Sequence, residues 1–486
     1  GTDYTDGSGS VDDIVISAGS TTGTVSFTPT DDSIYDATSN ETATIAINGV
    51  SGKTGVAEHG TPQTVTITIT DNESAPTVTL SRSASAIDED SGSTVTITAT
   101  LSVATFQDVT VSIDGTGGTG TEGTDFGTVS DITISAGATT GTAAVDPTDD
   151  SVYEGNETAG ISISGVSGGG ASESGSQSVT VTITENESAP TVTLTVSATS
   201  IAENAGSSLT LTATLSQVVD EDVTVVIGTS GTAVEGTDYT DGSGAIDDIT
   251  ISAGSTTATA NFTPTDDSIY EINETATISI SSVSGADASI SGGSQSVSIT
   301  LTSNESAPTV TLTVSASSIN ENAGSSVTIT ATLSGTTYEN VTVGLGFSGA
   351  TEGTDFTDGS GSVDDITISA GNTTGTVNFT PEDDSVYEGN ETVTVTIDSV
   401  SNGGATESGS QSKTIQITDN ESAPTVTLAT SATSIAENAG SSLTLTATLS
   451  GATDADITVA LDTSSSATEG TDYGAVSDIT ISAGAT

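Results

Sequence analysis

Short stretches in which apolar residues alternate with Thr or Ser recur along the whole chain. Residues 95–101 read Val-Thr-Ile-Thr-Ala-Thr-Leu, and residues 109–113 and 179–183 show the same alternation. A period of two is typical of strands that bury one face, and Val, Ile and Thr favour strands. No segment shows a sustained helical period. The pattern therefore predicts an all-β protein.

The alternating stretches belong to a long repeat. The segment Ser-Ala-Pro-Thr-Val-Thr-Leu places its proline at 76, 190, 308 and 424, which are 114, 118 and 116 residues apart. An immunoglobulin-like β-sandwich needs about 100 residues and roughly seven strands, whereas solenoid repeats span only ~20–50 residues. We expect three complete repeats over residues 75–189, 190–307 and 308–423. Residues 1–74 match the later part of a repeat, and residues 424–486 match the first part.

The order of elements can be followed within the repeat 190–307. We expect a turn at 201–206, a loop at 235–239 and a tight turn at Ala253-Gly254, because glycine tolerates the backbone angles of such turns. Strands are expected near 192–196, 209–215, 223–227, 249–252, 275–280 and 297–301, with another that carries Phe262. The fold class is thus a tandem array of immunoglobulin-like sandwiches with about seven strands each.

An acidic segment recurs once in each repeat. Asp266-Asp-Ser-Ile-Tyr-Glu271-Ile-Asn-Glu274 has counterparts at 149–157 and 383–391, and a variant at 31–41. The chain holds 65 Asp and Glu against 3 Lys and Arg, which gives a net charge of −62. Clustered acids repel each other, and hard divalent cations with oxygen ligands, above all calcium, relieve that repulsion. A solvated acidic surface is the alternative, but these acids return at fixed loop positions beside a Tyr.

Composition excludes several classes of function. Nucleic acids and anionic membranes are bound through basic patches, and no apolar run approaches the ~20 residues of a membrane helix. With no Cys and a single His, His59, the chain offers no thiolate metal site and no recurring nucleophile–base pair. We therefore expect no enzyme activity, no nucleic-acid partner and no membrane insertion.

Several ordered motifs together resemble the Calx-β domain. They are Glu-Gly-Thr-Asp-Tyr, a glycine-turn hairpin, Asp-Asp-x-x-Tyr-Glu-x-x-Glu and a closing Thr-Ile-Thr-Asp-Asn-Glu. The Calx-β domain is an immunoglobulin-like sandwich known from sodium/calcium exchangers, from integrin β4 and from large microbial surface proteins. The resemblance implies that calcium lies at one end of each sandwich, against the linker to the next domain.

The resemblance also assigns calcium ligands residue by residue. In the second unit they are Glu89, Asp125, Asp149, Asp150, Glu154, Glu157, Glu185 and Glu187. In the third unit they are Glu203, Asp238, Asp266, Asp267, Glu271, Glu274 and Glu305, and in the fourth Glu321, Asp355, Asp383, Asp384, Glu388, Glu391, Asp419 and Glu421. The leading fragment retains Asp3, Asp31, Asp32, Glu41, Asp71 and Glu73, and the trailing fragment Glu437 and Asp472.

Two departures from this pattern predict differences between units. The third unit closes on Ser303-Asn-Glu305 where its neighbours have a second acid, so one ion is in doubt there. The leading fragment has two extra residues between Tyr35 and Glu41, with Asp36 in place of the usual glutamate. Calcium affinity is therefore expected to vary along the chain.

The function expected from these features is structural. We expect an extended, calcium-stiffened stalk or fibre on a microbial cell surface, as in the repeat region of an adhesin. Its partners would be calcium ions, neighbouring repeats of the chain and other copies of the chain in a fibre. As an alternative reading of the two flanking fragments, half-domains of neighbouring chains complete each other in such a fibre. A calcium-sensing regulatory module is a second hypothesis. A ligand-binding adhesin module is a third, with Tyr338 and Phe347 as its only indications.

Overall fold

Each complete repeat folds into two β-sheets packed face to face. The computed structural model describes residues 4–5, 11–36, 41–359 and 361–486. In the third unit one sheet has the order β20-β22-β18-β16-β25 and the other β17-β26-β24-β19-β21. The strands of the first sheet are β16 (Thr191–Val196), β18 (Leu209–Leu215), β20 (Tyr239–Thr240), β22 (Thr257–Pro264) and β25 (Ser289–Ile290). Those of the second are β17 (Ser200–Ala202), β19 (Val223–Gly231), β21 (Ile249–Ile251), β24 (Glu274–Ser284) and β26 (Ser296–Thr302).

The second and fourth units repeat this architecture. The second unit consists of β6 (Thr77–Arg82), β7 (Ala86–Asp88), β8 (Val95–Leu101), β10 (Val109–Gly118), β11 (Ile132–Ile134), β12 (Thr140–Val145), β13 (Glu157–Ser167), β14 (Ser172–Glu173) and β15 (Ser178–Thr184). The fourth consists of β27 (Thr309–Val314), β28 (Ser318–Asn320), β29 (Val327–Leu333), β31 (Val341–Ser348), β32 (Phe356–Thr357), β33 (Ile366–Ile368), β34 (Thr374–Pro381), β36 (Glu391–Ser401), β37 (Thr406–Glu407) and β38 (Ser412–Thr418). The expectation of an all-β array of immunoglobulin-like sandwiches is confirmed.

The alternation in the sequence produces the core of each unit. Every second residue of β18 is buried, and β8 and β29 show the same pattern. Tyr239 stacks on Phe262 in the third unit at 4.5 Å between ring centroids, and Phe356 stacks on Phe379 in the fourth at 4.6 Å. Aromatic pairs at this spacing stabilise a core beyond their buried area. Each complete unit therefore has a hydrophobic core of its own.

The predicted turn at 201–206 is more structured than expected. Residues 200–202 form β17, which pairs parallel with β26, and the 3-10 helix η2 (Glu203–Ala205) follows it. The second unit has the equivalent pair β7 and η1 (Glu89–Ser91). Strands of three residues are too short to show a period, which is why the pattern missed them. The third unit also has η3 (Ser291–Gly293).

The two flanking fragments form isolated strand pairs. β1 (Tyr4–Thr5) pairs with β2 (Thr28–Pro29), β4 (Glu41–Ala46) with β5 (Thr64–Ile69), β39 (Val426–Thr430) with β40 (Leu445–Leu449), and β42 (Ile457–Val459) with β43 (Ile479–Ile481). Apolar side chains whose counterparts in the complete sandwiches are buried are exposed here, among them Ile14, Ile16 and Leu428.

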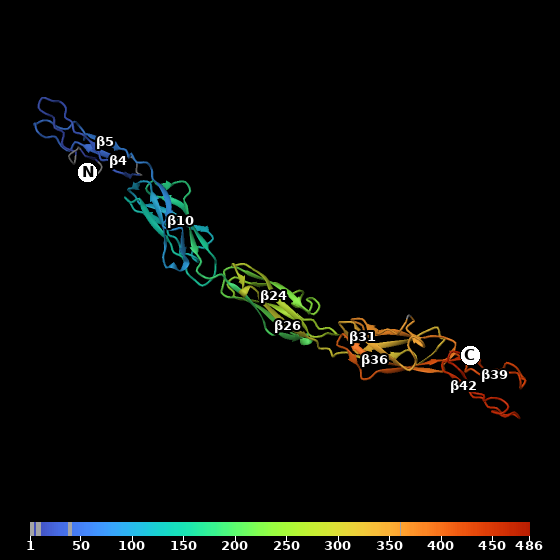
Figure 1. Ribbon diagram of the computed structural model, residues 1–486. Helices are drawn as coiled ribbons and strands as arrows, with labels where there is room; N and C mark the ends of the chain where they lie inside the picture. The colour runs from blue at the N-terminus through green and yellow to red at the C-terminus, as the bar shows by residue number, and fades with distance from the viewer. Residues whose placement is uncertain (1–3, 6–10, 37–40, 360) are drawn as a thin grey trace.

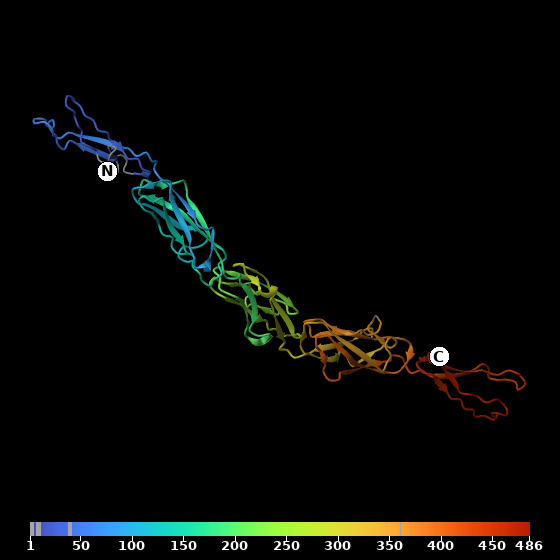
Figure 2. The same cartoon turned by 60° about the vertical axis from the view of Figure 1, so that its left-hand side comes forward.

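The units follow one another end to end in an elongated array, with the colours running in chain order from blue to red (Figures 1 and 2). Among the described residues, no helix is both long and apolar enough to cross a membrane. In each complete unit four acidic segments meet at one end: the turn after the second strand, the Glu-Gly-Thr-Asp loop, the Asp-Asp-x-x-Tyr-Glu segment and the residues after the last strand.

Candidate metal centre

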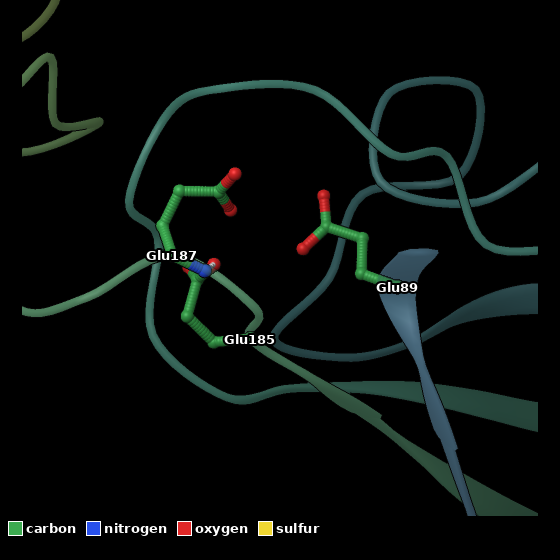
Figure 3. Close-up of side chains that lie close together, drawn as sticks. All are labelled: Glu89, Glu185 and Glu187. Atoms are coloured by element: carbon green, nitrogen blue, oxygen red, sulfur yellow. Dashed lines mark hydrogen bonds between the residues drawn. The ribbon is translucent and has the colours of Figure 1, made fainter. Parts of the chain in front are cut away.

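The first acidic triad of the second unit joins Glu89, Glu185 and Glu187. One carboxylate oxygen from each lies within 4.8 Å of the others. Figure 3 shows Glu89 approaching from the end of one strand, while Glu185 and Glu187 come from the segment that follows β15. Glu89 begins the 3-10 turn η1 and is buried. The fold thus brings Glu89 together with two acids that lie 96 and 98 residues later in the sequence.

Hydrogen bonds divide the protons unequally within this triad. Glu185 accepts backbone N–H groups of Glu154 and Gly155 at 2.6 and 2.9 Å. Burial alone would raise its pKa, but these bonds outweigh burial and the pKa of Glu185 is lowered. The hydrogen bond from Glu187 to this carboxylate, together with burial, raises the pKa of Glu187 to about 7. Burial raises the pKa of Glu89, and the charge of Glu185 adds to the effect. One member is therefore ionised while the other two resist ionisation.

A second triad in the same unit joins Asp125, Glu154 and Glu157. Asp125 belongs to the Glu-Gly-Thr-Asp loop and accepts the Thr121 N–H at 2.5 Å, and Glu157 is the first residue of β13. Burial raises the pKa of Glu154 to about 7 and that of Glu157 to about 8. The neighbouring carboxylate of Asp125 contributes to both shifts. Without a cation, Glu154 and Glu157 therefore retain protons near neutral pH.

Asp149 and Asp150 lie beside the first triad. Asp149 accepts a hydrogen bond from the Asn186 side chain at 3.0 Å, and Asp150 accepts the Val152 N–H at 2.7 Å. Both aspartates contribute to the raised pKa of Glu89. The eight acids that the sequence assigns to the second unit are therefore gathered at one end of its sandwich.

The fourth unit has both triads, whereas the described residues of the third unit form only one. The fourth unit joins Glu321 with Asp419 and Glu421, and Asp355 with Glu388 and Glu391; the third joins Asp238 with Glu271 and Glu274. Asp383 and Asp384 lie near Glu321, and their charges contribute to its raised pKa. Asp266 and Asp267 contribute in the same way to the raised pKa of Glu203.

Ser303 accounts for the missing triad of the third unit. Its hydroxyl donates a hydrogen bond to Glu305 at 3.0 Å, in the position where Glu185 and Asp419 supply a carboxylate. Glu203, which is 6% exposed, is left with an Oε2 atom that has no hydrogen-bond partner. Burial, together with the charges of Glu271 and Glu305, raises the pKa of Glu203 to about 7.

The fragments gather fewer acids. The acids Asp31, Asp32, Asp36, Glu41, Asp71 and Glu73 line a cavity of about 380 Å³ in the leading fragment. Asp3 lies outside the described residues. In the trailing fragment Asp472 accepts the Thr468 N–H at 2.7 Å, and Glu437 is exposed. Where the structure describes these fragments, neither brings three acids as close together as the triads of the complete units.

Two further acids come from the following unit, and the pattern within one repeat could not reveal them. Asp220 adds to the raised pKa values of Glu154 and Glu157, and Asp454 does the same for Glu391. Asp220 lies in the turn before the strand that begins at Val223, and Asp454 lies in the equivalent turn before the strand that begins at Ile457. The second and fourth units have Phe106 and Tyr338 at this position. Aligning the four turns would have shown this difference. At two junctions the second triad thus has an acid of the next unit beside it.

Replacing Asp220 tests its contribution to a metal site at the junction. We expect Asp220→Asn to weaken calcium binding at the second-to-third junction by roughly tenfold or more, which is the usual effect of losing a supporting carboxylate. Isothermal titration calorimetry of the full chain would measure this loss. Glu221→Gln is the matched control, because Glu221 is exposed and is absent from the triad. Equal binding by both variants would remove Asp220 from the site.

The chemistry of the triads fits a hard divalent cation. Every ligand is a carboxylate, and calcium takes ~6–8 oxygen ligands. The Oε2 atoms of Glu187, Glu203 and Glu421 are buried without a hydrogen-bond partner, and a buried acceptor left unsatisfied costs about 1–3 kcal/mol, more when charged. Since the whole sequence holds only 3 Lys and Arg, basic side chains cannot neutralise these clusters. The residues present therefore fit calcium.

Comparison with solved structures finds matches at low sequence identity. The calcium binding domain CBD12 of CALX1.1 shares 14% sequence identity, with 45% of this chain and 96% of that chain covered and a TM-score of 0.21. The bacterial integrin-binding protein invasin shares 16%, covering 76% of this chain and 67% of that chain, with a TM-score of 0.24. The adhesin InvE of Yersinia pseudotuberculosis shares 15%, covering 47% and 59%, with a TM-score of 0.21.

The family comparison covers almost the whole chain. The Calx-beta domain matches five successive segments, at residues 1–73, 71–187, 185–302, 303–421 and 419–481. A search of curated proteins finds no match. The five matches follow the repeat of the acidic motifs, and the resemblance seen in the sequence is confirmed. The chain belongs to the Calx-beta domain family, of which it carries tandem copies.

Proposed function

We propose that this chain is the calcium-binding repeat region of a cell-surface protein and acts as an extended, calcium-stiffened stalk. The observation that carries the proposal is the position of the acidic triads, which recur at the same end of each complete unit, beside the segments that pair with the next unit. Sites for one ligand repeated along an array favour a mechanical role over a single recognition event.

Repulsion between the acids supplies the mechanism. Two carboxylates 4.8 Å apart repel each other by about 3–4 kcal/mol at an effective dielectric constant of ~20. Ionised Asp125, Glu154 and Glu157 would push apart the loops that carry them, and also Asp220 on the next unit. A bound calcium ion supplies compensating charge. The carboxylates then hold their loops, and the following turn, in one arrangement.

The alternative of a ligand-binding module loses its sequence support. Phe347 packs against Phe356 in the core of the fourth unit, at 5.3 Å between ring centroids. Tyr338 lies at the junction with the third unit, where its N–H donates to Tyr270. Both side chains are half-buried, so neither presents a fully exposed aromatic ring. We infer that these repeats position another part of their protein and carry out no catalysis themselves.

Small-angle X-ray scattering of the full chain tests the proposal. With millimolar calcium, which suffices for the ~10⁻⁴–10⁻³ M affinities of extracellular modules, we expect an elongated and rigid particle. In chelator the average length should decrease and the scattering should show flexibility, because unneutralised acids loosen the junctions. Identical profiles in both conditions would refute calcium stiffening and leave a spacer whose acids serve solubility.

A further inference from the structure

A second connection between units is formed by strand pairing and by the tyrosine of each acidic segment. At three junctions two-stranded parallel pairs join one unit to the next: β3 (Ile34–Tyr35) with β9 (Ala104–Thr105), β23 (Ile269–Tyr270) with β30 (Thr336–Thr337), and β35 (Val386–Tyr387) with β41 (Ala452–Thr453). At the remaining junction Tyr153 forms a parallel bridge with Val219, and its N–H donates to Val218 at 3.0 Å. The Tyr of every acidic segment therefore pairs in the same register with the following unit.

The receiving position is held rigidly in all four cases. The residues opposite the tyrosines, Thr105, Val219, Thr337 and Thr453, are all buried. The carbonyl of each accepts an N–H from a hairpin glycine of its own unit, at 2.8 to 2.9 Å. Each threonine hydroxyl also donates to a backbone carbonyl two residues later. The tyrosine strand therefore docks on a surface that the next unit has already fixed.

The tyrosine side chain reaches into the next unit. Tyr153 is only 8% exposed and packs with the buried residues of the third unit. Its hydroxyl donates to Asp287 of that unit at 3.1 Å. Tyr270 lies against Gly404 of the fourth unit, where an added Cβ would come within 2.5 Å of the ring. Both tyrosines thus leave their own sandwich to fill the base of the next.

The turn that receives the tyrosine has an unusual backbone. Residues 168–170, 285–287 and 402–404 each run through three consecutive positive φ angles. In the third unit two of these residues are not glycine, since Ala286 and Asp287 have φ of 49° and 48°. Left-handed backbone costs about 1–2 kcal/mol for residues with a side chain. Strain of this kind persists where surrounding contacts impose it and often marks a functional contact. Here the strained residue Asp287 accepts the hydrogen bond from Tyr153.

We propose that these contacts form a tyrosine lock, a metal-independent docking site by which each unit holds the next in a fixed register and direction. The lock consists of the parallel pairing of the tyrosine segment and the insertion of its ring at the left-handed turn. It uses backbone groups and a phenol ring, so it persists when calcium is removed. Calcium then acts on a junction that is already formed, because it compensates the charge of the acids beside it.

Distances between spin labels on neighbouring units test the lock in the full chain. Because the chain has no cysteine, introduced cysteines label uniquely. Thr142, Thr259 and Thr376 are exposed and occupy equivalent strand positions in the second, third and fourth units. We expect the Thr142→Cys/Thr259→Cys pair in chelator to keep the mean distance it has in calcium, within a wider distribution. Tyr153→Ala should broaden and shift that distribution in chelator, whereas Tyr153→Phe, which retains the ring, should preserve most of it.

The next junction supplies a matched pair of variants. Gly404→Ala places a methyl group against Tyr270 and should broaden the Thr259→Cys/Thr376→Cys distribution. Gly409→Ala is the control, since Gly409 has a similar φ of 65° but nothing within 4 Å of an added Cβ. If Tyr153→Ala and Gly404→Ala leave the distributions in chelator unchanged, there is no lock. If unaltered junctions give the same distribution with and without calcium while Tyr153→Ala broadens it, the lock stands and calcium stiffening fails.

Discussion

In chelator, the melting temperature of the chain is expected to fall as the pH is raised from about 4.5 to about 8. The pKa of Glu154, Glu203 and Glu274 is raised to about 7, and that of Glu157 to about 8, in each case chiefly by burial. In the unfolded chain these glutamates titrate near ~4.3. Between those values the folded chain binds more protons than the unfolded chain, so its stability decreases with rising pH. Their contribution is fully present below pH ~4.3 and is lost above pH ~8.

Calcium should reverse this dependence. The ion binds ionised carboxylates, so its stabilising effect should be small near pH 4.5 and large near pH 8. At roughly 10 mM free calcium and a Kd of ~10⁻⁴–10⁻³ M, each ion bound only by the folded chain adds about 1.4–2.7 kcal/mol.

Calorimetric melting with calcium, with chelator and with sodium chloride at matched ionic strength separates binding from screening. Surface screening operates over a Debye length of about 10 Å at 0.1 M salt. If sodium chloride stabilised the chain as strongly as calcium, the triads would be a screened surface and not a binding site. A melting temperature in chelator that did not vary with pH would show that the glutamates are not crowded together as described.

Periodicity predicted the strands well where they are long and buried on one face. Residues 209–215 were expected to form a strand and form β18 with the same bounds, because every second side chain points into the core. Strands of only two or three residues, such as β17 and β25, were not predicted. Their positions depend on hydrogen bonds to distant strands, and no local pattern encodes such bonds.

The candidate site was predictable as far as it belongs to one repeat. The acids of the second triad, such as Asp238 and Glu274, stand at fixed places in the motif, and the structure brings them together. The substitution at Ser303 was visible in the sequence and coincides with the missing triad of the third unit. Asp220 was missed because it approaches from the following unit, and Tyr153 was noticed only as a neighbour of the acids. Contacts between units depend on how two sandwiches are placed end to end, which the sequence of one repeat does not specify.

Glu203→Gln is expected to stabilise the third unit in chelator and to reduce the stability that this unit gains from calcium. Glu203 is nearly fully buried, and one of its carboxylate oxygens has no hydrogen-bond partner. An amide of the same shape removes the buried charge and relieves repulsion from Glu271 and Glu305. In chelator at pH ~8 we expect the variant to be more stable by on the order of 1–3 kcal/mol, the scale of one relieved carboxylate–carboxylate repulsion at an effective dielectric constant of ~20. With calcium it should gain less than the unaltered chain, because the neutral amide attracts the ion more weakly.

Hydrogen exchange resolved by peptide assigns the change to one unit, since the opening of each region is reported separately. Protection of β18 and β26 should increase in chelator and respond less to calcium, while β29 and β38 of the fourth unit provide an internal reference. Asp247→Asn is the matched control, because Asp247 is an exposed acid of the same unit and surface substitutions usually change stability by less than about 0.5 kcal/mol. If Glu203→Gln destabilised the third unit in chelator, the carboxylate would itself be a structural hydrogen-bonding group. Glu203 would then no longer be counted among the proposed calcium ligands.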